Sequence, residues 1–136
     1  GVLRIEDGML CASCGIRSSV GSAKLYVSEK IQYLTEFLGG EYTVMGDYPA
    51  WEYKKDSVLR ELMADTYREL FGKEASVKAI HAGLECGLFY DKIPGLDCVS
   101  FGPSMQDIHT TEEKLSISST ARMWEYLVKV LENIRG

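Results

Sequence analysis

Hydrophobic residues recur at helical spacing in three stretches of the chain. The pattern predicts helices over residues 21–38, 57–71 and 119–133. The side chains that could cap them are, in chain order, Ser18 or Ser19, Asp56 or Ser57, and Ser118 or Ser119. The residues expected to face a core are Val27, Ile31, Leu34 and Leu38; then Leu59, Met63, Thr66 and Leu70; then Trp124, Leu127, Val128, Leu131 and Ile134.

Short apolar or alternating runs before and between these helices predict strands. The runs are Val2–Ile5, Met9–Arg17, Glu41–Met45, Val77–Ile80 and Cys98–Phe101. Asp7-Gly8 is a turn signal that would join the first two runs as a hairpin. The element order predicts an α/β (α+β) fold. A strand, helix, strand unit resembling half of a split βαβ layer precedes an α-β-α-β-α arrangement.

Length and composition describe a globular protein. The 136 residues are 46% hydrophobic and 26% charged, with three prolines, and this length can bury a core in one domain or in two lobes. The segment Gly46–Trp51 breaks the periodicity, so we expect a boundary there, with residues 1–50 and 51–136 as the two parts.

The charge balance and hydropathy narrow the classes of partner. A formal net charge of −5 without a run of Lys or Arg argues against nucleic acid or an anionic membrane as the main partner. No apolar stretch approaches the roughly 18 residues that a membrane-spanning helix needs. The first residue is Gly1 rather than Met, so we expect a fragment or a processed product.

Four cysteines at positions 11, 14, 86 and 98 raise the question of a structural zinc site. Cys11 and Cys14 have C-x-x-C spacing, but residues three apart on the predicted strand point to opposite faces, and no second C-x-x-C follows. Small buried thiols in a reducing cytosol are the preferred interpretation.

Both histidines lie in polar loops that follow predicted strands. His81 opens a turn that contains Gly83 and Glu85, and His109 lies close to Asp107. Loops at the carboxyl ends of strands bind ligands in open α/β sheets, so these two loops are expected to face one site. The residues alone leave His109 as a metal ligand, a general base or an exposed loop histidine, and His81 as structural or catalytic.

Two further residues have both a functional and a structural interpretation. Arg17 could clamp a carboxylate through two parallel hydrogen bonds, or pair with a surface acid. Glu85 could be a first-turn carboxylate favoured by the helix dipole. Two histidines and scattered acids do not complete a catalytic metal site, which usually takes three or more protein ligands.

Several motifs together resemble one enzyme family. They are Ile16–Ser19, Gly46–Trp51, His81–Phe89 (H-A-G-L-E-C-G-L-F), Val99–Pro103, and His109 followed by T-T-E-E. In this order they are similar to the C-terminal part of the aminoacyl-histidine dipeptidases (Xaa-His dipeptidases, carnosinase-like enzymes) of the M20 metallopeptidase family. A set that extends in order over nearly the whole chain is more specific than any one motif.

The resemblance implies an architecture and an activity. Members of this family have a zinc-containing catalytic domain and an inserted lid domain, and they hydrolyse dipeptides with a metal-bound water. By resemblance, residues 1–50 are the end of the lid, and residues 51–136 are the C-terminal part of a mixed-sheet, helix-flanked catalytic domain.

The resemblance also implies roles for single residues. His109 matches the C-terminal zinc ligand, and Arg17 matches the lid arginine that grips the substrate's terminal carboxylate. Gly83 matches the glycine of the substrate-binding loop, where the lack of a side chain lets the backbone approach the ligand. His81 and Glu85 flank that glycine and are expected to support the loop.

The resemblance implies that the other metal ligands and the general base lie in an N-terminal half that this sequence does not contain. We therefore expect a fragment of a cytoplasmic zinc dipeptidase, with no catalytic residue of its own, no turnover alone and no tightly bound zinc. The longer enzyme would take a small peptide as substrate, and a homodimer is left open. The alternatives are a non-catalytic α/β interaction module, or another M20 activity such as an aminoacylase, tripeptidase or carboxypeptidase.

Overall fold

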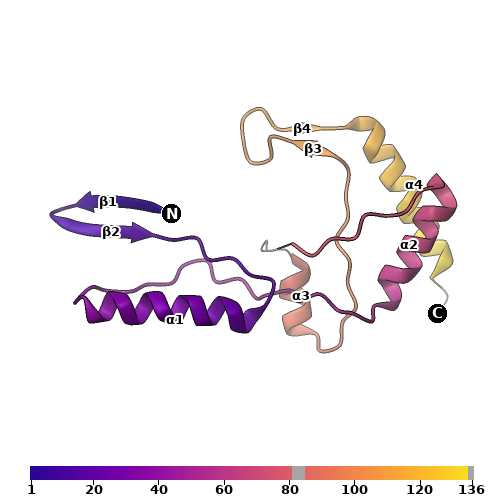
Figure 1. Ribbon diagram of the computed structural model, residues 1–136. Coiled ribbons are helices and arrows are strands. Elements are labelled where there is room, and N and C mark those ends of the chain that lie inside the picture. Colours follow the sequence, from indigo (N-terminus) through magenta and orange to yellow (C-terminus); the bar gives the residue numbers. More distant parts are fainter. Residues whose placement is uncertain (81–84, 135–136) are drawn as a thin grey trace. The chain divides into compact units, whose positions relative to one another are not determined.

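The computed structural model describes residues 1–80 and 85–134, which form four helices and two antiparallel sheets of two strands each (Figure 1). The predicted mixed α and β class is confirmed. The chain divides into two compact units, which are described separately. Unit 1 is Gly1–Tyr53 with Ala79–Lys92, and unit 2 is Lys54–Lys78 with Ile93–Gly136. The predicted boundary near residue 50 stays a prediction.

Unit 1 begins with a β-hairpin. Strands β1 (Val2–Glu6) and β2 (Met9–Ser13) pair antiparallel, and Glu6 lies opposite Met9. Asp7 and Gly8 both have positive φ, 51° and 78°, as a two-residue hairpin turn requires, so the predicted Asp-Gly turn is confirmed. The prediction that this second strand reaches Arg17 is wrong, because β1 has no residues left to pair beyond Ser13.

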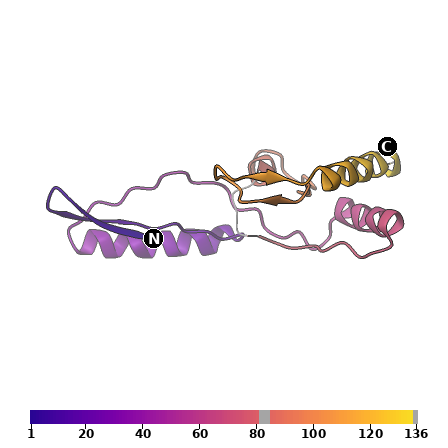
Figure 2. The ribbon, with the colours of Figure 1, turned by 90° about the horizontal axis from the view of Figure 1, so that it is seen from above.

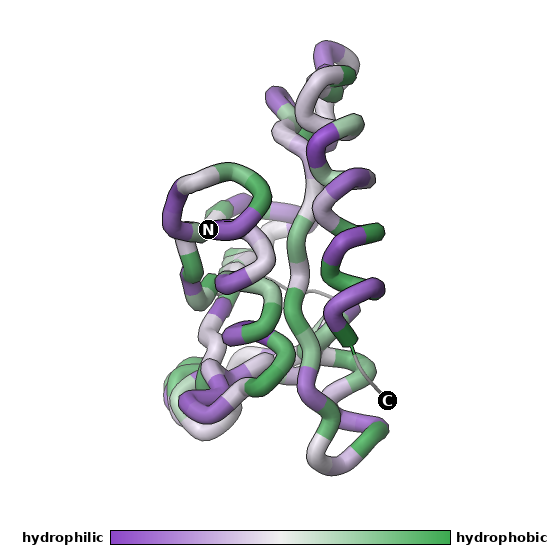
Figure 3. The backbone as a smooth tube through the Cα atoms, turned by 90° about the vertical axis from the view of Figure 1, so that its right-hand side faces the viewer, coloured by the Kyte–Doolittle hydropathy of each residue, from purple (hydrophilic) through white to green (hydrophobic). Residues whose placement is uncertain are grey.

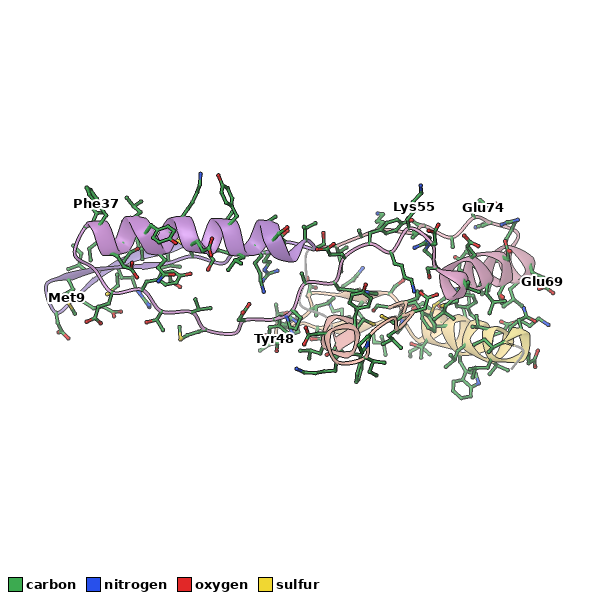
Figure 4. The ribbon with its side chains drawn as sticks, turned by 90° about the horizontal axis from the view of Figure 1, so that it is seen from below. Met9, Phe37, Tyr48, Lys55, Glu69 and Glu74 are labelled. Carbon is green, nitrogen blue, oxygen red and sulfur yellow. The ribbon has the colours of Figure 1, made fainter. Side chains whose placement is uncertain are left out.

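Helix α1 (Gly21–Phe37) runs alongside this hairpin (Figures 1 and 2). It ends as predicted where Gly39 adopts a left-handed φ of 78°. However, α1 buries none of its residues, and the side chain of Phe37 is 87% exposed and points away from the helix (Figure 4). The expected helix is therefore present, but none of the residues of its apolar stripe is buried.

An irregular segment, residues 46–53, contacts both α1 and helix α3 (Glu85–Lys92). The Glu52 side chain accepts a hydrogen bond from the Gly21 backbone N–H, and Lys24 donates to the Tyr48 carbonyl. Gly87 of α3 is buried against the same segment, and a Cβ there would lie 3.1 Å from the carbonyl oxygen of Pro49. Glycine thus permits the close approach of α3 to this segment.

Unit 2 is built on helices α2 (Val58–Phe71) and α4 (Ile117–Asn133), which lie side by side (Figures 1 and 2). Their core contains Met63, Tyr126 and Val130, and Thr66 is also buried. The Tyr126 hydroxyl donates to the Met63 carbonyl oxygen at 2.7 Å, so its one polar group is satisfied inside the core. The predicted core stripe of α2 is confirmed, because Leu59 and Leu70 pack against this cluster.

The residues of α4 that were predicted to face the core are not those that contact α2, so this prediction is wrong. Hydrophobic residues recur along this helix (Figure 3), and they fall on two adjoining faces that together form one broad apolar side. Tyr126 and Val130 face α2, whereas Trp124 is 68% exposed and Leu131 is also exposed. The periodicity identified an apolar face that has no packed partner among the described residues.

Helix α2 is capped at its N-terminus as predicted. Ser57 accepts from the Arg60 backbone N–H, and its own hydroxyl donates to Asp97, whose other carboxylate oxygen accepts from the Leu59 backbone N–H. Burial raises the pKa of Asp97, but the two hydrogen bonds, with Lys54 and Arg60 nearby, outweigh it and leave that pKa below its ordinary value. Helix α4 begins earlier than predicted, and Ser116 caps it.

The second sheet of the chain lies in unit 2, is short, and occupies a stretch predicted as loop. Strands β3 (Met105–Gln106) and β4 (Lys114–Leu115) form a hairpin. The predicted strands at 41–45, 77–80 and 98–101 are wrong, since residues 1–80 and 85–134 contain strands only in β1–β4. An apolar run becomes a strand when another strand pairs with it, and the described residues supply none here.

Candidate functional site

His109 lies in the seven-residue loop between β3 and β4, in unit 2. Its side chain is exposed, and its backbone is left-handed, with φ at 67°. Asp107, two residues before it, is also left-handed, with φ at 52°. This conformation is uncommon for residues other than glycine, although Asn, Asp and His adopt it more readily than most.

Hydrogen bonds within the loop hold this backbone. The Asp107 carbonyl accepts from both the backbone N–H and the hydroxyl of Thr110, at 3.2 and 2.7 Å. The His109 backbone N–H donates to Oε2 of Glu113 at 2.9 Å. The loop is therefore a closed, hydrogen-bonded structure that presents the His109 imidazole to solvent.

The hairpin that carries this loop is fixed to helix α4. The Ser116 backbone N–H donates to the Ser104 carbonyl at 3.0 Å, and the Ser104 backbone N–H donates to the Ser119 hydroxyl at 2.8 Å. Ser116 also caps α4. The β3–β4 hairpin leads into α4 (Figure 2), and these contacts attach the loop of His109 to the first turn of that helix.

Arg17 lies between β2 and α1, in unit 1. Its side chain is exposed, and within residues 1–80 and 85–134 no hydrogen bond or ion pair involves it. The next residue, Ser18, accepts from the Val20 backbone N–H at 3.0 Å and shapes the turn into α1. The planar guanidinium is consequently available for a carboxylate ligand. The convergence of Arg17 and His109 on one ligand stays a prediction.

The predicted substrate loop is described in part. His81 and Gly83 lie outside the described residues. Glu85 is the first residue of α3 and is exposed, so its predicted place in the first turn of a helix is confirmed, while its support of the loop stays a prediction.

The donor groups fit one position of a metal site. A ring nitrogen of histidine on an exposed loop is a good zinc ligand, and His109 provides one. Within the described ranges, however, no three His, Cys, Asp or Glu side chains lie close enough to hold a metal ion. No disulfide joins the four cysteines, all of which are described; Cys14 is exposed and the others are half-buried, so the prediction of buried thiols is wrong.

Three residues have structural roles that the sequence did not predict. Glu113 holds the His109 backbone, Gly87 admits the segment 46–53 against α3, and Asp97 completes the cap of α2. Asp97 lies 38 residues from Leu59, so no local pattern connects them. Glu113 belongs to the quoted T-T-E-E motif, and its four-residue distance from His109 is the signal that could have identified it.

Comparisons with known proteins give a consistent result. The chain is 36% identical over 134 residues to the cytosol non-specific dipeptidase of Escherichia coli strain K12, covering 98% of this chain and 28% of that protein. The crystal structure of aminoacylhistidine dipeptidase from Vibrio alginolyticus matches with a TM-score of 0.72 and 35% identity, covering 87% of this chain and 24% of that one. The chain therefore spans about a quarter of the length of these relatives.

The family assignment follows from a match to a family model. The family model described as peptidase family M20/M25/M40 matches residues 5–133. None of the helices in the described part of the chain is long and apolar enough to cross a membrane. Because the family model extends over nearly all 136 residues, the resemblance drawn from the motifs is confirmed, and the chain belongs to peptidase family M20/M25/M40.

Proposed function

We propose that this chain is part of a longer cytosolic, zinc-dependent dipeptidase and supplies one metal ligand and part of the substrate site. The observation that carries the proposal is the His109 loop, a hydrogen-bonded hairpin turn that presents an imidazole to solvent in a chain of the M20 family. The high coverage of this chain by two dipeptidases supports the same activity.

Each proposed role follows from the chemistry of its residue. His109 would bind zinc through a neutral ring nitrogen, and Arg17 would grip the terminal carboxylate of a peptide with its planar fork of donors. Gly83 would let the loop backbone approach the substrate, with His81 and Glu85 as supports. A bound zinc ion in such an enzyme polarises the peptide carbonyl and lowers the pKa of water.

The chain alone is proposed to be inactive and to bind zinc weakly. A catalytic zinc site takes three protein ligands as a rule, and the described residues bring no three donors together. Exposed apolar faces on α1 and α4 support the proposal that a longer protein covers them.

The proposed substrates are dipeptides of the Xaa-His type. The relative from Vibrio alginolyticus is named an aminoacylhistidine dipeptidase, which supports this choice. The relative from Escherichia coli is named a non-specific dipeptidase, and this name favours broader dipeptide hydrolysis as the second candidate.

The test is an assay of the full-length protein with zinc. Its substrates are carnosine-like dipeptides, dipeptides without histidine, tripeptides and N-acyl amino acids. The proposal expects zinc-dependent hydrolysis of dipeptides, with Xaa-His dipeptides cleaved best; equal rates on all dipeptides would establish the broader candidate. Cleavage of tripeptides or N-acyl amino acids alone, or no hydrolysis with zinc present, would contradict the dipeptidase assignment.

A further inference from the structure

The left-handed backbone of His109 needs an interaction that holds it in place. A positive φ crowds the Cβ atom of any residue other than glycine, so the His109 conformation is less stable on its own than an extended or right-handed one. Rotation about the N–Cα bond back to negative φ would carry the Cβ atom, and the imidazole with it, to a different direction. The direction of the ring thus depends on what keeps φ at 67°.

Glu113 supplies the interaction that holds the His109 backbone. Its Oε2 accepts the hydrogen bond of the His109 backbone N–H at 2.9 Å. A carboxylate accepts such a bond more strongly than a neutral group does. Because Glu113 follows His109 in the chain, this hydrogen bond closes a ring that contains the N–Cα bond of His109, and the closed ring restrains the rotation that would redirect the imidazole.

Glu113 is itself held by the hairpin. Its backbone N–H donates to the Thr110 carbonyl at 3.3 Å, and the next residue, Lys114, pairs with Gln106 in the β3–β4 ladder. The carboxylate is therefore attached at the end of the loop where the strands pair, and from there it accepts the backbone N–H of His109.

We propose that Glu113 is a positioning residue for the metal site: by accepting the His109 backbone N–H, it keeps the His109 imidazole directed for metal binding. This inference rests on the proposed function, in which His109 is a zinc ligand. Residues that orient a metal ligand affect metal affinity although they do not touch the metal. Here the orientation acts through the backbone of the ligand rather than through its ring.

The chain offers a matched control one position away. Glu112 has the same side chain, and its backbone N–H donates to the Thr110 hydroxyl at 3.2 Å. In the described part of the chain, its carboxylate takes part in no hydrogen bond or ion pair. Replacing Glu112 removes the same charge at the neighbouring position without removing the hydrogen bond.

The experiment measures zinc affinity in the full-length protein by competition with a chelator. Glu113→Ala removes the acceptor and should weaken zinc binding about tenfold or more, as loss of an orienting residue does. Glu113→Gln keeps an oxygen acceptor and should stay within about threefold, and Glu112→Ala within about twofold. In the metal-free proteins, hydrogen–deuterium exchange of residues 107–113 should accelerate in Glu113→Ala only.

Two results would overturn the inference. The first is a Glu113→Ala variant with the zinc affinity and the exchange rates of the wild type, which would show that the Glu113 carboxylate does not hold the His109 backbone. The second is a Glu113→Gln variant that binds zinc as weakly as Glu113→Ala, which would show that the charge of Glu113 acts rather than its hydrogen bond. If the Ala variant does not fold, Glu113→Asp replaces it, since the shorter side chain cannot span the loop. Unchanged zinc affinity in His109→Ala would instead refute the proposed function, while the exchange experiment would still test the Glu113 contact.

Discussion

The two apolar faces of α4 show what helical periodicity does and does not determine. One face, with Tyr126 and Val130, packs on α2 and is almost completely buried. The adjoining face, with Trp124 and Leu131, is as hydrophobic in sequence but exposed in this chain. The apolar side of α4 is therefore wider than the part that α2 covers, and periodicity alone does not tell which part is packed.

The largest effect is expected from the packed face. Tyr126→Ala should destabilise the chain by about 3–5 kcal/mol, because it opens a cavity and leaves the Met63 carbonyl without its donor. Trp124→Ala, an aromatic truncation two residues away, should change the free energy of unfolding by less than about 0.5 kcal/mol. Chemical denaturation of the two variants measures the difference; equal costs would show that the two faces are packed alike.

The second-largest effect on stability is expected from the exposed face of α4, and only in the longer protein proposed above. If another layer covers α4 there, Trp124→Ala should cost about 2 kcal/mol or more in the full-length protein, since a buried aromatic side chain is lost. The comparison is between the same substitution in the two chain lengths. A cost below about 0.5 kcal/mol in both would refute a covering layer.

A smaller effect concerns the hydroxyl of Tyr126. Tyr126→Phe keeps the ring contacts with Tyr67 and Phe101 and removes only the hydrogen bond to Met63, so it should cost about 1 kcal/mol. Denaturation midpoints of the wild type and of the Phe variant measure this cost. A loss as large as that of Tyr126→Ala would mean that the ring contacts contribute little.

The smallest effect is pH-dependent and concerns the cap of α2. Because the pKa of Asp97 is lower in the folded chain, its carboxylate stabilises the fold above its ordinary value of about 4, and this contribution is lost as the pH falls through the lowered pKa. Asp97→Asn should remove at most about 1 kcal/mol near neutral pH, since the group is partly exposed to solvent.

Acid titration of stability checks this prediction. Below pH 4 or so, the difference between the wild type and Asp97→Asn should shrink, because protonated Asp97 also lacks its charge. Asp56→Asn is the control, since Asp56 is exposed and, within residues 1–80 and 85–134, forms no hydrogen bond or ion pair. A pH-independent difference for Asp97→Asn would contradict the assigned role.

Local patterns predicted the elements whose cause is local. The Asp-Gly hairpin turn, the Ser57 cap of α2 and the glycine stop of α1 depend on residues within a few positions of one another, and they are confirmed. The runs at 77–80 and 98–101 have the composition of strands, but a strand also requires a partner, which local sequence does not contain.

The candidate site was predictable to a similar extent. The position of His109 on a polar loop followed from composition, whereas the left-handed backbone and the reach of Glu113 depend on how that loop closes between β3 and β4. The roles of Arg17, Gly83 and His109 in binding stay predictions, because they concern ligands that further parts of the protein would help to hold.

The central claim is that His109 is a zinc ligand of a longer peptidase, and zinc content per chain tests it most directly. The full-length wild type and Glu112→Ala should retain zinc after dialysis against a weak chelator, as measured by elemental mass spectrometry. His109→Ala should lose it, because one of the few protein ligands is gone. Equal zinc content in His109→Ala and the wild type would contradict the account.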